Sequence, residues 1–159
     1  MNTEQKNIQA ALALKQFRVI FRSIKKHSQS IERKCQVSGS QLWALALVAE
    51  TPGIRVTELA DKLSIHQSTA SNLIDQLVHK KLLRRERAAS DNRVVKLYLT
   101  EAGGSIVQQA PEPLRGLLLD ALEQLPPEML VQLNSRLGEL LHAMKSRDEG
   151  AGGMPLTDI

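Results

Sequence analysis

The sequence predicts a mainly α-helical protein that carries one small β-hairpin. Long stretches of its 159 residues repeat apolar side chains at steps of three and four, the spacing of one face of an α-helix. Between residues 84 and 99 the spacing changes to alternation, which is typical of β-strands. Two short helical stretches precede this hairpin and are separated by a tight turn. The predicted fold class is therefore mainly α, a winged helix-turn-helix with a small β-hairpin wing.

The composition predicts one soluble domain with a sizeable core. No apolar run approaches the roughly 18 residues of a membrane span, and the polar N-terminus lacks the apolar core of a signal peptide. The one cysteine and the four scattered histidines match no metal-ligand spacing. No phosphate loop, nucleophile–base pair or paired carboxylates can be recognised. We expect a cytoplasmic protein that is not an enzyme and has no cofactor, metal or membrane partner.

The first predicted helix runs from about Lys6 to Lys34. Its apolar side chains form a wide face, and basic side chains lie opposite. The apolar positions are Ile8, Leu12, Leu14, Phe17, Val19, Phe21, Ile24, Ile31 and Cys35. A helix of this length cannot bury the whole face inside so small a domain. We therefore expect part of it to pack against another chain.

A second helix is predicted from Gln41 to Glu50. Ser38 or Ser40 is its expected N-cap, since a serine hydroxyl accepts a hydrogen bond from the first turn. Pro52 marks its end. The following stretch, Ile54 to Val56, is short and β-branched at two positions. We expect it to pair as an edge strand with the later hairpin.

Two short helices form the predicted helix-turn-helix. Thr57 is the expected N-cap of the first, which ends at Leu63. A turn at Ser64–His66 leads to the second, the recognition helix, which we expect from Gln67 to about Lys81. The exposed side at its start is polar, whereas an ordinary solvated face is richer in Lys and Glu. This composition favours a helix that contacts DNA bases.

The hairpin after the recognition helix is the predicted wing. Its first strand covers Arg84–Arg87, its tip 88–93 and its second strand Val94–Leu99. Basic residues outnumber acidic ones from 80 to 96. The acidic residues there are Glu86 and Asp91, and the basic ones are Lys80, Lys81, Arg84, Arg85, Arg87, Arg93 and Lys96. The whole chain has a formal net charge of +4. So dense a positive stretch beside a polar helix indicates a footprint for phosphates.

Helices are predicted again after the wing. Thr100 is the expected N-cap of a helix that Pro111 and Pro113 bring to an end. The last helix is expected from about Glu128 to Lys145, where leucines recur at steps of three and four. The Gly-rich, polar stretch 147–159 is predicted to be a flexible tail.

Two stretches carry a resemblance to a known family. Residues 91–103, DNRVVKLYLTEAG, match a wing signature in which Asp-x-Arg precedes a strand that ends in Leu-Thr, followed by an acidic residue and Gly. Residues 56–63, VTELADKL, match the usual first helix of the same family's helix-turn-helix. Over residues 10–146 the chain resembles the MarR family of bacterial transcriptional regulators.

The resemblance implies a single MarR-like domain over 1–159, with a DNA-binding winged helix-turn-helix at 54–99. It also implies a homodimer, with an all-helical dimerisation region built from the N- and C-terminal helices, 6–36 and 101–146. The implied partner is double-stranded DNA with a palindromic operator. Members of the family usually repress nearby genes. Many release DNA when a small aromatic or phenolic effector binds between the two regions, and some respond to thiol oxidation.

Two features depart from the family pattern. Lys81 stands where a glycine usually precedes the first wing strand, so the recognition helix lacks its usual cap residue. We expect this helix either to run on or to end differently, which would change the angle of the wing. Pro111 and Pro113 also interrupt what is often one long helix in the family.

The candidate DNA contacts lie on the helix-turn-helix and the wing. They are Arg55, Thr57, His66, Gln67, Ser68, Ser71, Asn72, Arg85, Arg87, Asp91 and Arg93. Gln67 and Asn72 carry amides that pair bidentately with adenine, whereas the serines suit base edges or phosphates. The other basic residues are candidates for phosphate contacts that position the protein. On the family pattern, Arg93 enters the minor groove and Asp91 orients it by an ion pair.

Three further interpretations stay open. Cys35 is a candidate peroxide sensor, although its place on the apolar face favours a buried thiol. Phe21 and Trp43 are candidates for the pocket of an aromatic effector, or else core residues. A winged-helix module that binds an acidic protein instead of DNA is the alternative to a DNA-binding regulator.

Overall fold

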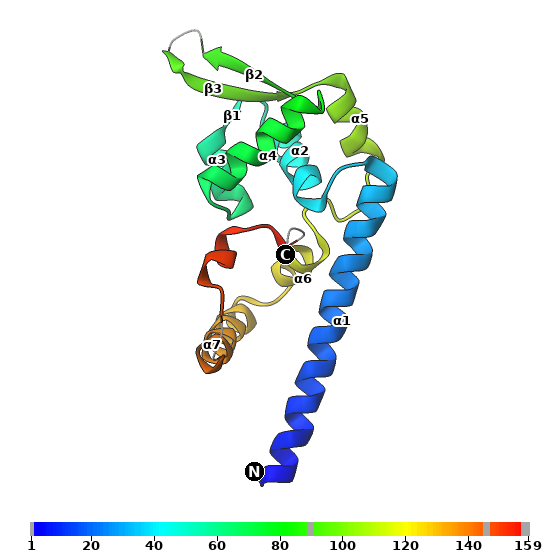
Figure 1. Cartoon of the computed structure of the whole chain (residues 1–159), viewed down its shortest axis with the longest axis vertical. Helices are drawn as coiled ribbons and strands as arrows, with labels where there is room; N and C mark the ends of the chain where they lie inside the picture. The colour runs from blue at the N-terminus through cyan, green and yellow to red at the C-terminus, as the bar shows by residue number, and fades with distance from the viewer. Residues whose placement is uncertain (1, 89–90, 145–146, 157–159) are drawn as a thin grey trace.

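The computed structural model describes residues 2–88, 91–144 and 147–156, with only the backbone at 88 and 91–93. A compact winged helix-turn-helix lies at one end, and long helices extend away from it (Figure 1). The elements in chain order are α1 Thr3–Cys35, α2 Gly39–Glu50, β1 Ile54–Arg55, α3 Val56–Leu63, α4 Gln67–His79, β2 Leu83–Ala88, β3 Asp91–Leu99, α5 Glu101–Gln109, α6 Leu117–Glu123, α7 Pro127–Ala143 and the 3-10 helix η1 Glu149–Gly153. This arrangement confirms the predicted fold class.

The three strands form one antiparallel sheet in the order β1-β3-β2. Ile54 of β1 lies opposite Leu97 of β3, and Leu83 at the start of β2 lies opposite Leu99. The prediction of an edge strand after α2 is thus confirmed. Because Ile54, Leu83 and Leu97 are all buried, the base of the hairpin is anchored in the core, and its strands extend away from the core as far as Ala88 and Asp91 (Figure 1).

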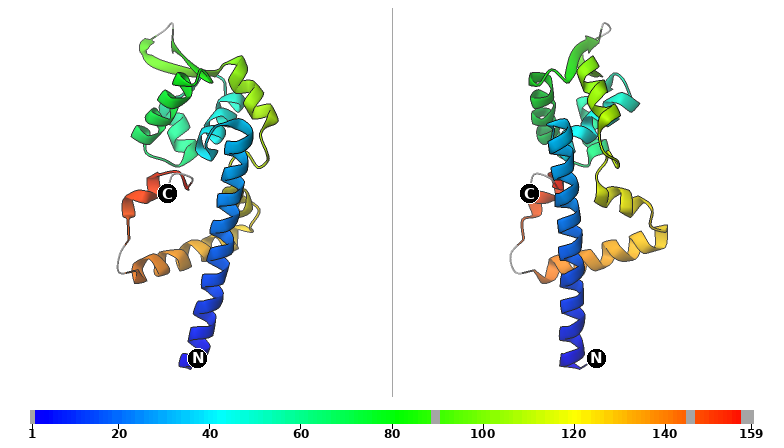
Figure 2. Two further views of the ribbon diagram at one scale, coloured as in Figure 1. Left: turned by 45° about the vertical axis from the view of Figure 1, so that its right-hand side comes forward. Right: turned by 90° about the vertical axis from the view of Figure 1, so that its right-hand side faces the viewer.

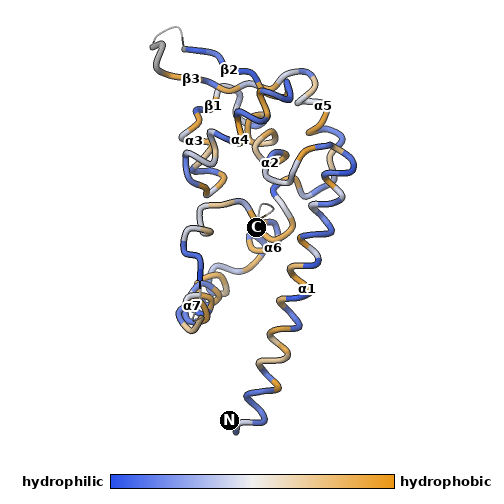
Figure 3. Tube along the Cα trace, in the orientation of Figure 1, coloured by the Kyte–Doolittle hydropathy of each residue, from blue (hydrophilic) through white to orange (hydrophobic). Residues whose placement is uncertain are grey.

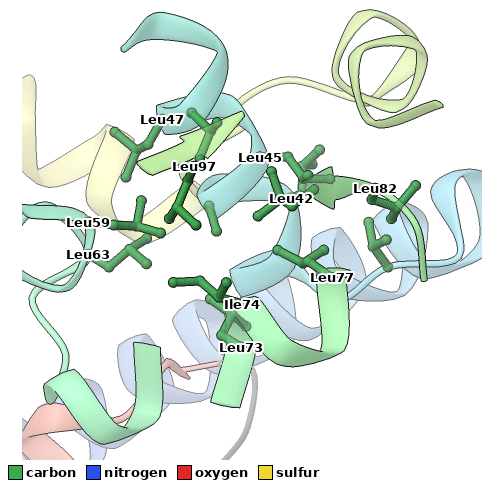
Figure 4. Close-up of a cluster of buried hydrophobic side chains, with 14 of the residues drawn as sticks. Leu42, Leu45, Leu47, Leu59, Leu63, Leu73, Ile74, Leu77, Leu82 and Leu97 are labelled. Atoms are coloured by element: carbon green, nitrogen blue, oxygen red, sulfur yellow. The ribbon is translucent and has the colours of Figure 1, made fainter. Parts of the chain in front are cut away.

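The hydrophobic core lies between α2, α3, α4 and the base of the wing (Figure 4). Its fully buried members include Leu42, Leu45, Ile54, Leu59, Ile74, Leu77, Leu83 and Leu97. The last turn of α1 adds Ile31, which is 1% exposed, and Cys35, which is 8% exposed. The winged helix-turn-helix therefore closes its own core within one chain.

The helix caps partly match the prediction. Of the two candidate serines, Ser38 caps α2, because its hydroxyl oxygen accepts a hydrogen bond from the Gln41 N–H at 3.2 Å. The expected cap by Thr57 is wrong. Helix α3 begins two residues earlier, at Val56 with Arg55 as its N-cap residue, and the Glu58 carboxylate accepts a hydrogen bond from the Arg55 N–H at 2.8 Å. The Glu58 carboxylate thus satisfies the backbone N–H of the N-cap residue, which is the part that the third helical residue plays in a capping box.

Lys81 replaces the usual glycine without changing how a helix can end there. Helix α4 stops at His79, and Lys81 takes the left-handed conformation, with φ of 59°. The Leu82 N–H donates to the Leu77 carbonyl and the Lys81 N–H to the Val78 carbonyl, each at 2.9 Å. These two bonds make a Schellman motif. The lysine therefore accepts a conformation that glycine adopts at lower free energy, and the helix does not run on.

The two ends of the wing are joined at its base. The Thr100 hydroxyl donates to the carbonyls of Lys81 and Leu82, at 2.8 and 3.1 Å, and accepts from the Gly103 N–H at 3.1 Å. The last bond confirms Thr100 as the N-cap of α5. A Cβ at Gly103 would collide with the Leu82 carbonyl oxygen. This glycine is therefore required for α5 to approach the start of the wing.

Two helices, α7 and the part of α1 that precedes its buried last turns, are exposed and are here called the arms (Figures 1 and 2). Helix α5 ends at Gln109, as the two prolines predict. Helix α1 extends far beyond the core, and α7 crosses it at a steep angle (Figure 2). Apolar positions continue along both arms (Figure 3), where Phe21 is 63% and Val131 is 69% exposed. After α7 the chain returns toward the helix-turn-helix and forms η1 (Figure 2). The predicted flexibility of 147–159 stays a prediction.

Candidate nucleic-acid interface and the adjoining cavity

The recognition helix α4 has one buried and one exposed side. Ala70, Leu73, Ile74 and Leu77 turn into the core. The opposite side carries the predicted base-reading residues, of which Gln67, Ser68 and Asn72 are exposed and Ser71 is half-buried. The helix thus presents two amides and two hydroxyls to solvent while a rigid core fixes its orientation.

Polar bonds fix the far end of α4 to the preceding helices. The Gln41 side chain, which is 6% exposed, donates through Nε2 to the Gln76 Oε1 at 2.8 Å. The Lys80 Nζ donates to the Gln36 carbonyl at 3.0 Å and to the Gln41 Oε1 at 3.1 Å. These contacts join residues more than thirty positions apart, so the spacing in the sequence gave no signal of them. They link the recognition helix to the end of α1.

The arginines of the wing have different surroundings. The Arg85 guanidinium forms an ion pair with the Asp75 carboxylate of α4 at 2.6 Å, and both side chains are exposed. Arg84 pairs with Glu86 and lies over the Tyr98 ring, 4.8 Å from its centre. Arg87 is exposed further along β2. Arg85 therefore joins the wing to the recognition helix, a contact that its prediction as a phosphate ligand did not anticipate.

Three other predicted contacts lie at the starts of the two helices. Arg55 and Thr57 are exposed at the start of α3. His66 occupies the N-cap position of α4, and its backbone N–H donates to the Gly153 carbonyl at 3.1 Å. The side chains of Asp91 and Arg93 lie outside the part of the chain that the structure describes. Their roles stay predictions.

Cys35 is buried, as its place on the apolar face of the first helix predicted. It lies at the end of α1, and burial raises the pKa of its thiol, which the neighbouring Lys34 offsets only in part. A thiolate is the reactive form of cysteine, and a raised pKa lowers its population at neutral pH. This environment disfavours peroxide sensing by Cys35.

A cavity of about 270 Å³ lies between the helix-turn-helix and the arms. Its walls come from Ile24 and Ile31 of α1, Trp43 of α2, Ile65 of the turn before α4 and leucines of α6. Met154, Pro155 and Leu156 of the C-terminal segment complete it. The lining is mainly aliphatic, so the site suits a small apolar compound.

Polar groups border this cavity at a few points. The Trp43 Nε1 is buried and has no hydrogen-bond partner among the described residues. The His27 Nε2 lies 3.1 Å from the Pro113 carbonyl oxygen, and Arg115 donates to both Glu123 carboxylate oxygens at 3.0 Å. Of the two aromatic candidates, Trp43 lines the cavity, whereas Phe21 lies outside it and stacks near Phe17.

The described part of the chain holds neither a cluster of metal ligands nor a helix suited to a membrane. No group of three or more His, Cys, Asp or Glu side chains is arranged there to hold a metal ion. None of the described helices combines the length and the apolar character needed to cross a membrane.

Comparisons with known proteins agree on one family. Residues 37–95 match the model of the MarR family. The uncharacterised HTH-type transcriptional regulator YsmB of Bacillus subtilis is 27% identical over 133 residues, which cover 84% of this chain and 91% of YsmB. The uncharacterised HTH-type regulator YpoP of the same organism is 30% identical over 95 residues, which cover 60% of this chain and 67% of YpoP.

A solved structure extends the likeness to a protein bound to DNA. The MepR–DNA complex of Staphylococcus aureus has 26% sequence identity and a TM-score of 0.55. The match covers 80% of this chain and 93% of the MepR chain. The similarity therefore includes both the winged helix-turn-helix and much of the arms.

Proposed function

This chain belongs to the MarR family of transcriptional regulators, and we propose that it binds a palindromic DNA operator as a homodimer and represses the adjacent genes. The observation that carries the proposal is the position of the polar face of α4 beside the basic wing. The Arg85–Asp75 ion pair holds these two elements together. A major-groove reader and a phosphate-binding hairpin are thereby presented as one unit.

The roles within this unit follow from side-chain chemistry. Gln67 and Asn72 read base edges through their amides, and Ser68 and Ser71 bind base edges or phosphates. Arg55, Thr57, His66, Arg85 and Arg87 are the proposed positioning contacts to phosphates. Arg93, oriented by Asp91, is assigned to the minor groove by the family resemblance alone. The DNA-bound structure of MepR, which is similar over most of this chain, supports DNA as the partner.

The exposed arms support the homodimer. Apolar residues on α1 and α7 that a monomer leaves in solvent include Ile8, Leu12, Phe21, Met129, Val131, Leu140 and Leu141. Large exposed apolar faces of soluble proteins usually mark an interface. A two-fold axis between such arms places two copies of α4 on the same side of the dimer. Two half-sites about 34–36 Å apart are then the expected operator.

The cavity supports control by a small effector. It lies where the turn before α4 meets the arms, so a bound molecule contacts both parts of the chain. At about 270 Å³ it is at the small end of ligand pockets, which suits an aromatic or phenolic compound of one or two rings. Effector binding is proposed to release the DNA.

Selection of bound sequences from a random DNA pool tests the proposed function. We expect enrichment of an inverted repeat whose half-site centres are about one helical turn apart. No enrichment over random DNA at physiological salt would contradict specific regulation. It would instead favour the winged-helix module that binds an acidic protein. Redox control through Cys35 is disfavoured by the burial and raised pKa of that thiol.

A further inference from the structure

The C-terminal segment Gly153–Leu156, here called the strap, contacts two functional parts of the molecule. Its first residue accepts a hydrogen bond through the Gly153 carbonyl from the His66 N–H, at 3.1 Å. The next three residues form part of the cavity wall. In Figure 1 the red end of the chain accordingly lies beneath the helix-turn-helix. The strap thus joins the N-cap of the recognition helix to the cavity.

The contact between the strap and His66 is close. A Cβ built on Gly153 would overlap the imidazole ring of His66, whereas a Cβ on Gly152 would meet nothing. The strap can therefore occupy this place only with glycine at 153, unless the ring moves. His66 directly precedes Gln67, the first residue of α4. Any movement of the strap changes the surroundings of the residue that caps the recognition helix.

The rest of the strap is held by partial burial of apolar side chains. Met154 is 46% and Leu156 is 49% exposed, so each turns only part of its surface to the cavity. This burial favours the docked strap, and the conformational entropy lost by fixing its backbone opposes it. The docked state is favoured only by the difference between these two opposing contributions. A ligand that binds only the docked or only the released state can then shift the balance.

We propose that the strap closes the effector cavity from within the same chain and that an apolar effector displaces it, breaking the Gly153–His66 hydrogen bond. This rests on the proposed role of the cavity as an effector site. The ligand class is a small, largely apolar compound, since the lining of the cavity is mainly aliphatic. Displacement carries the signal to α4 through His66, the residue that the strap and the recognition helix share.

Trp43 provides a direct reporter, because it is the only tryptophan in the chain and lines the cavity. The probe is 6-propionyl-2-dimethylaminonaphthalene, a neutral two-ring dye for apolar sites that accepts excitation energy from tryptophan and fits the proposed ligand class. Energy transfer from Trp43 selects dye bound near the cavity over dye bound on the arms. The second readout is hydrogen exchange of the His66 amide, which the Gly153 carbonyl protects in the docked state.

The variants form matched sets in the full-length chain. Gly153→Ala introduces the methyl group that collides with His66, and Gly152→Ala is its neighbouring control. The double variant Met154→Ser with Leu156→Ser weakens the strap without using that collision. If the His66 ring rotates away from the added methyl group in Gly153→Ala, the strap can stay docked in that variant. The serine double variant then still tests whether the strap closes the cavity.

We expect the serine double variant to bind the dye near Trp43 about tenfold more tightly. In the unaltered protein the docked strap fills part of the cavity, so only the fraction of molecules with a released strap binds the dye, and the apparent affinity is reduced by that fraction. His66 amide exchange should accelerate by a similar factor. Gly153→Ala should follow in the same direction, and Gly152→Ala should match the unaltered protein. Unchanged dye affinity and unchanged His66 exchange in the serine variant would overturn the strap.

Failure of this proposal can be separated from failure of the proposed function. The dye and exchange measurements contain no DNA, so they do not depend on operator binding. If the serine variant changes neither dye affinity nor His66 exchange, but an operator is selected from the DNA pool, the strap proposal is wrong and the proposed function stands. Absence of energy transfer from Trp43 to the dye in every variant overturns the strap together with the effector role of the cavity, while DNA recognition stands.

Discussion

The winged helix-turn-helix and the arms use the same kinds of apolar residue in opposite ways. In the helix-turn-helix, Leu42, Leu45 and Leu77 are completely buried within one chain. On the arms, Phe21 and Val131 leave more than 60% of their surface in solvent. The first region is complete as a monomer, whereas the second requires another surface to cover it. This difference supports the proposal that the first region reads DNA and that the second joins two copies of the chain, with the cavity between the two regions.

The largest expected effect is on the stability of the closed core. Leu77→Ala should lower the free energy of unfolding by about 3 kcal/mol, because it leaves a cavity at a fully buried site. Urea denaturation measures this. Thr57→Ala is the control: the exposed Thr57 is not the N-cap of α3, so its loss should change stability by less than about 0.5 kcal/mol. A loss of only about 1 kcal/mol for Leu77→Ala would mean that this core is not closed.

The second effect is on self-association through the exposed apolar residues of α1 and α7. Phe21→Glu and Val131→Glu place a charge on exposed apolar faces, so they should not unfold the monomer. Burying that charge in an interface should weaken self-association about 100-fold, or about 2.7 kcal/mol. Sedimentation equilibrium measures this, and Lys62→Glu on the helix-turn-helix is the control. If both arm variants associate as the unaltered protein does, the arms are not the interface.

The third effect is on DNA binding by the polar face of α4. Asn72→Ala should weaken the free energy of operator binding by about 1–3 kcal/mol and relax the base preference at particular base pairs. Arg87→Ala should instead weaken binding to all DNA sequences alike. The slope of the logarithm of affinity against the logarithm of salt concentration should decrease in magnitude by about one. Fluorescence anisotropy with the selected operator and its point variants separates these patterns. Uniform weakening by Asn72→Ala would show that α4 does not read bases through this amide.

A smaller effect is expected where the recognition helix ends. Lys81→Gly should raise the free energy of unfolding by about 1 kcal/mol, since glycine adopts φ of 59° without the steric penalty of a side chain. Lys80→Gly is the adjacent control. Lys80 has φ of −71°, and its Nζ donates to the Gln36 carbonyl and the Gln41 Oε1, so glycine there should lower the free energy of unfolding. Thermal unfolding compares the two, and destabilisation by Lys81→Gly would contradict the described helix end.

The smallest effect is expected at Cys35. Because burial raises the pKa of the folded thiol, this group favours folding fully below the unfolded pKa. That contribution declines as the pH rises through the unfolded and then the folded pKa. At pH 7, Cys35→Ser and peroxide treatment should both leave operator affinity unchanged. Loss of binding on peroxide treatment that Cys35→Ser abolishes would establish the redox alternative.

The fold was largely predictable because its helices and strands have strong local patterns. The 3.6-residue periodicity predicted α1 and α4, and the alternation through Val95 and Leu97 predicted the wing. The cap of α3 was misplaced because Thr57 and the Arg55–Glu58 pair are competing local signals. The αL conformation of Lys81 is imposed by the core, which buries Leu82 directly after it.

The candidate site was less predictable than the fold. Residue type marked Gln67 and Asn72, since their chemistry is evident from the sequence. The Gln41–Gln76 and Arg85–Asp75 contacts depend on how the helices and the wing pack, and no spacing rule encodes them. The docking of Gly153 on His66 likewise needs the path of the chain after α7.

The mass of the protein–operator complex tests the account most directly, because it asks whether two copies complete each other and read two half-sites. Native mass spectrometry of the 17.6 kDa chain with the selected duplex measures it. The account predicts two chains on each duplex and loss of this species with Phe21→Glu. A single chain bound to the duplex, unaffected by Phe21→Glu, would contradict the division of the molecule into a complete reading unit and incomplete arms.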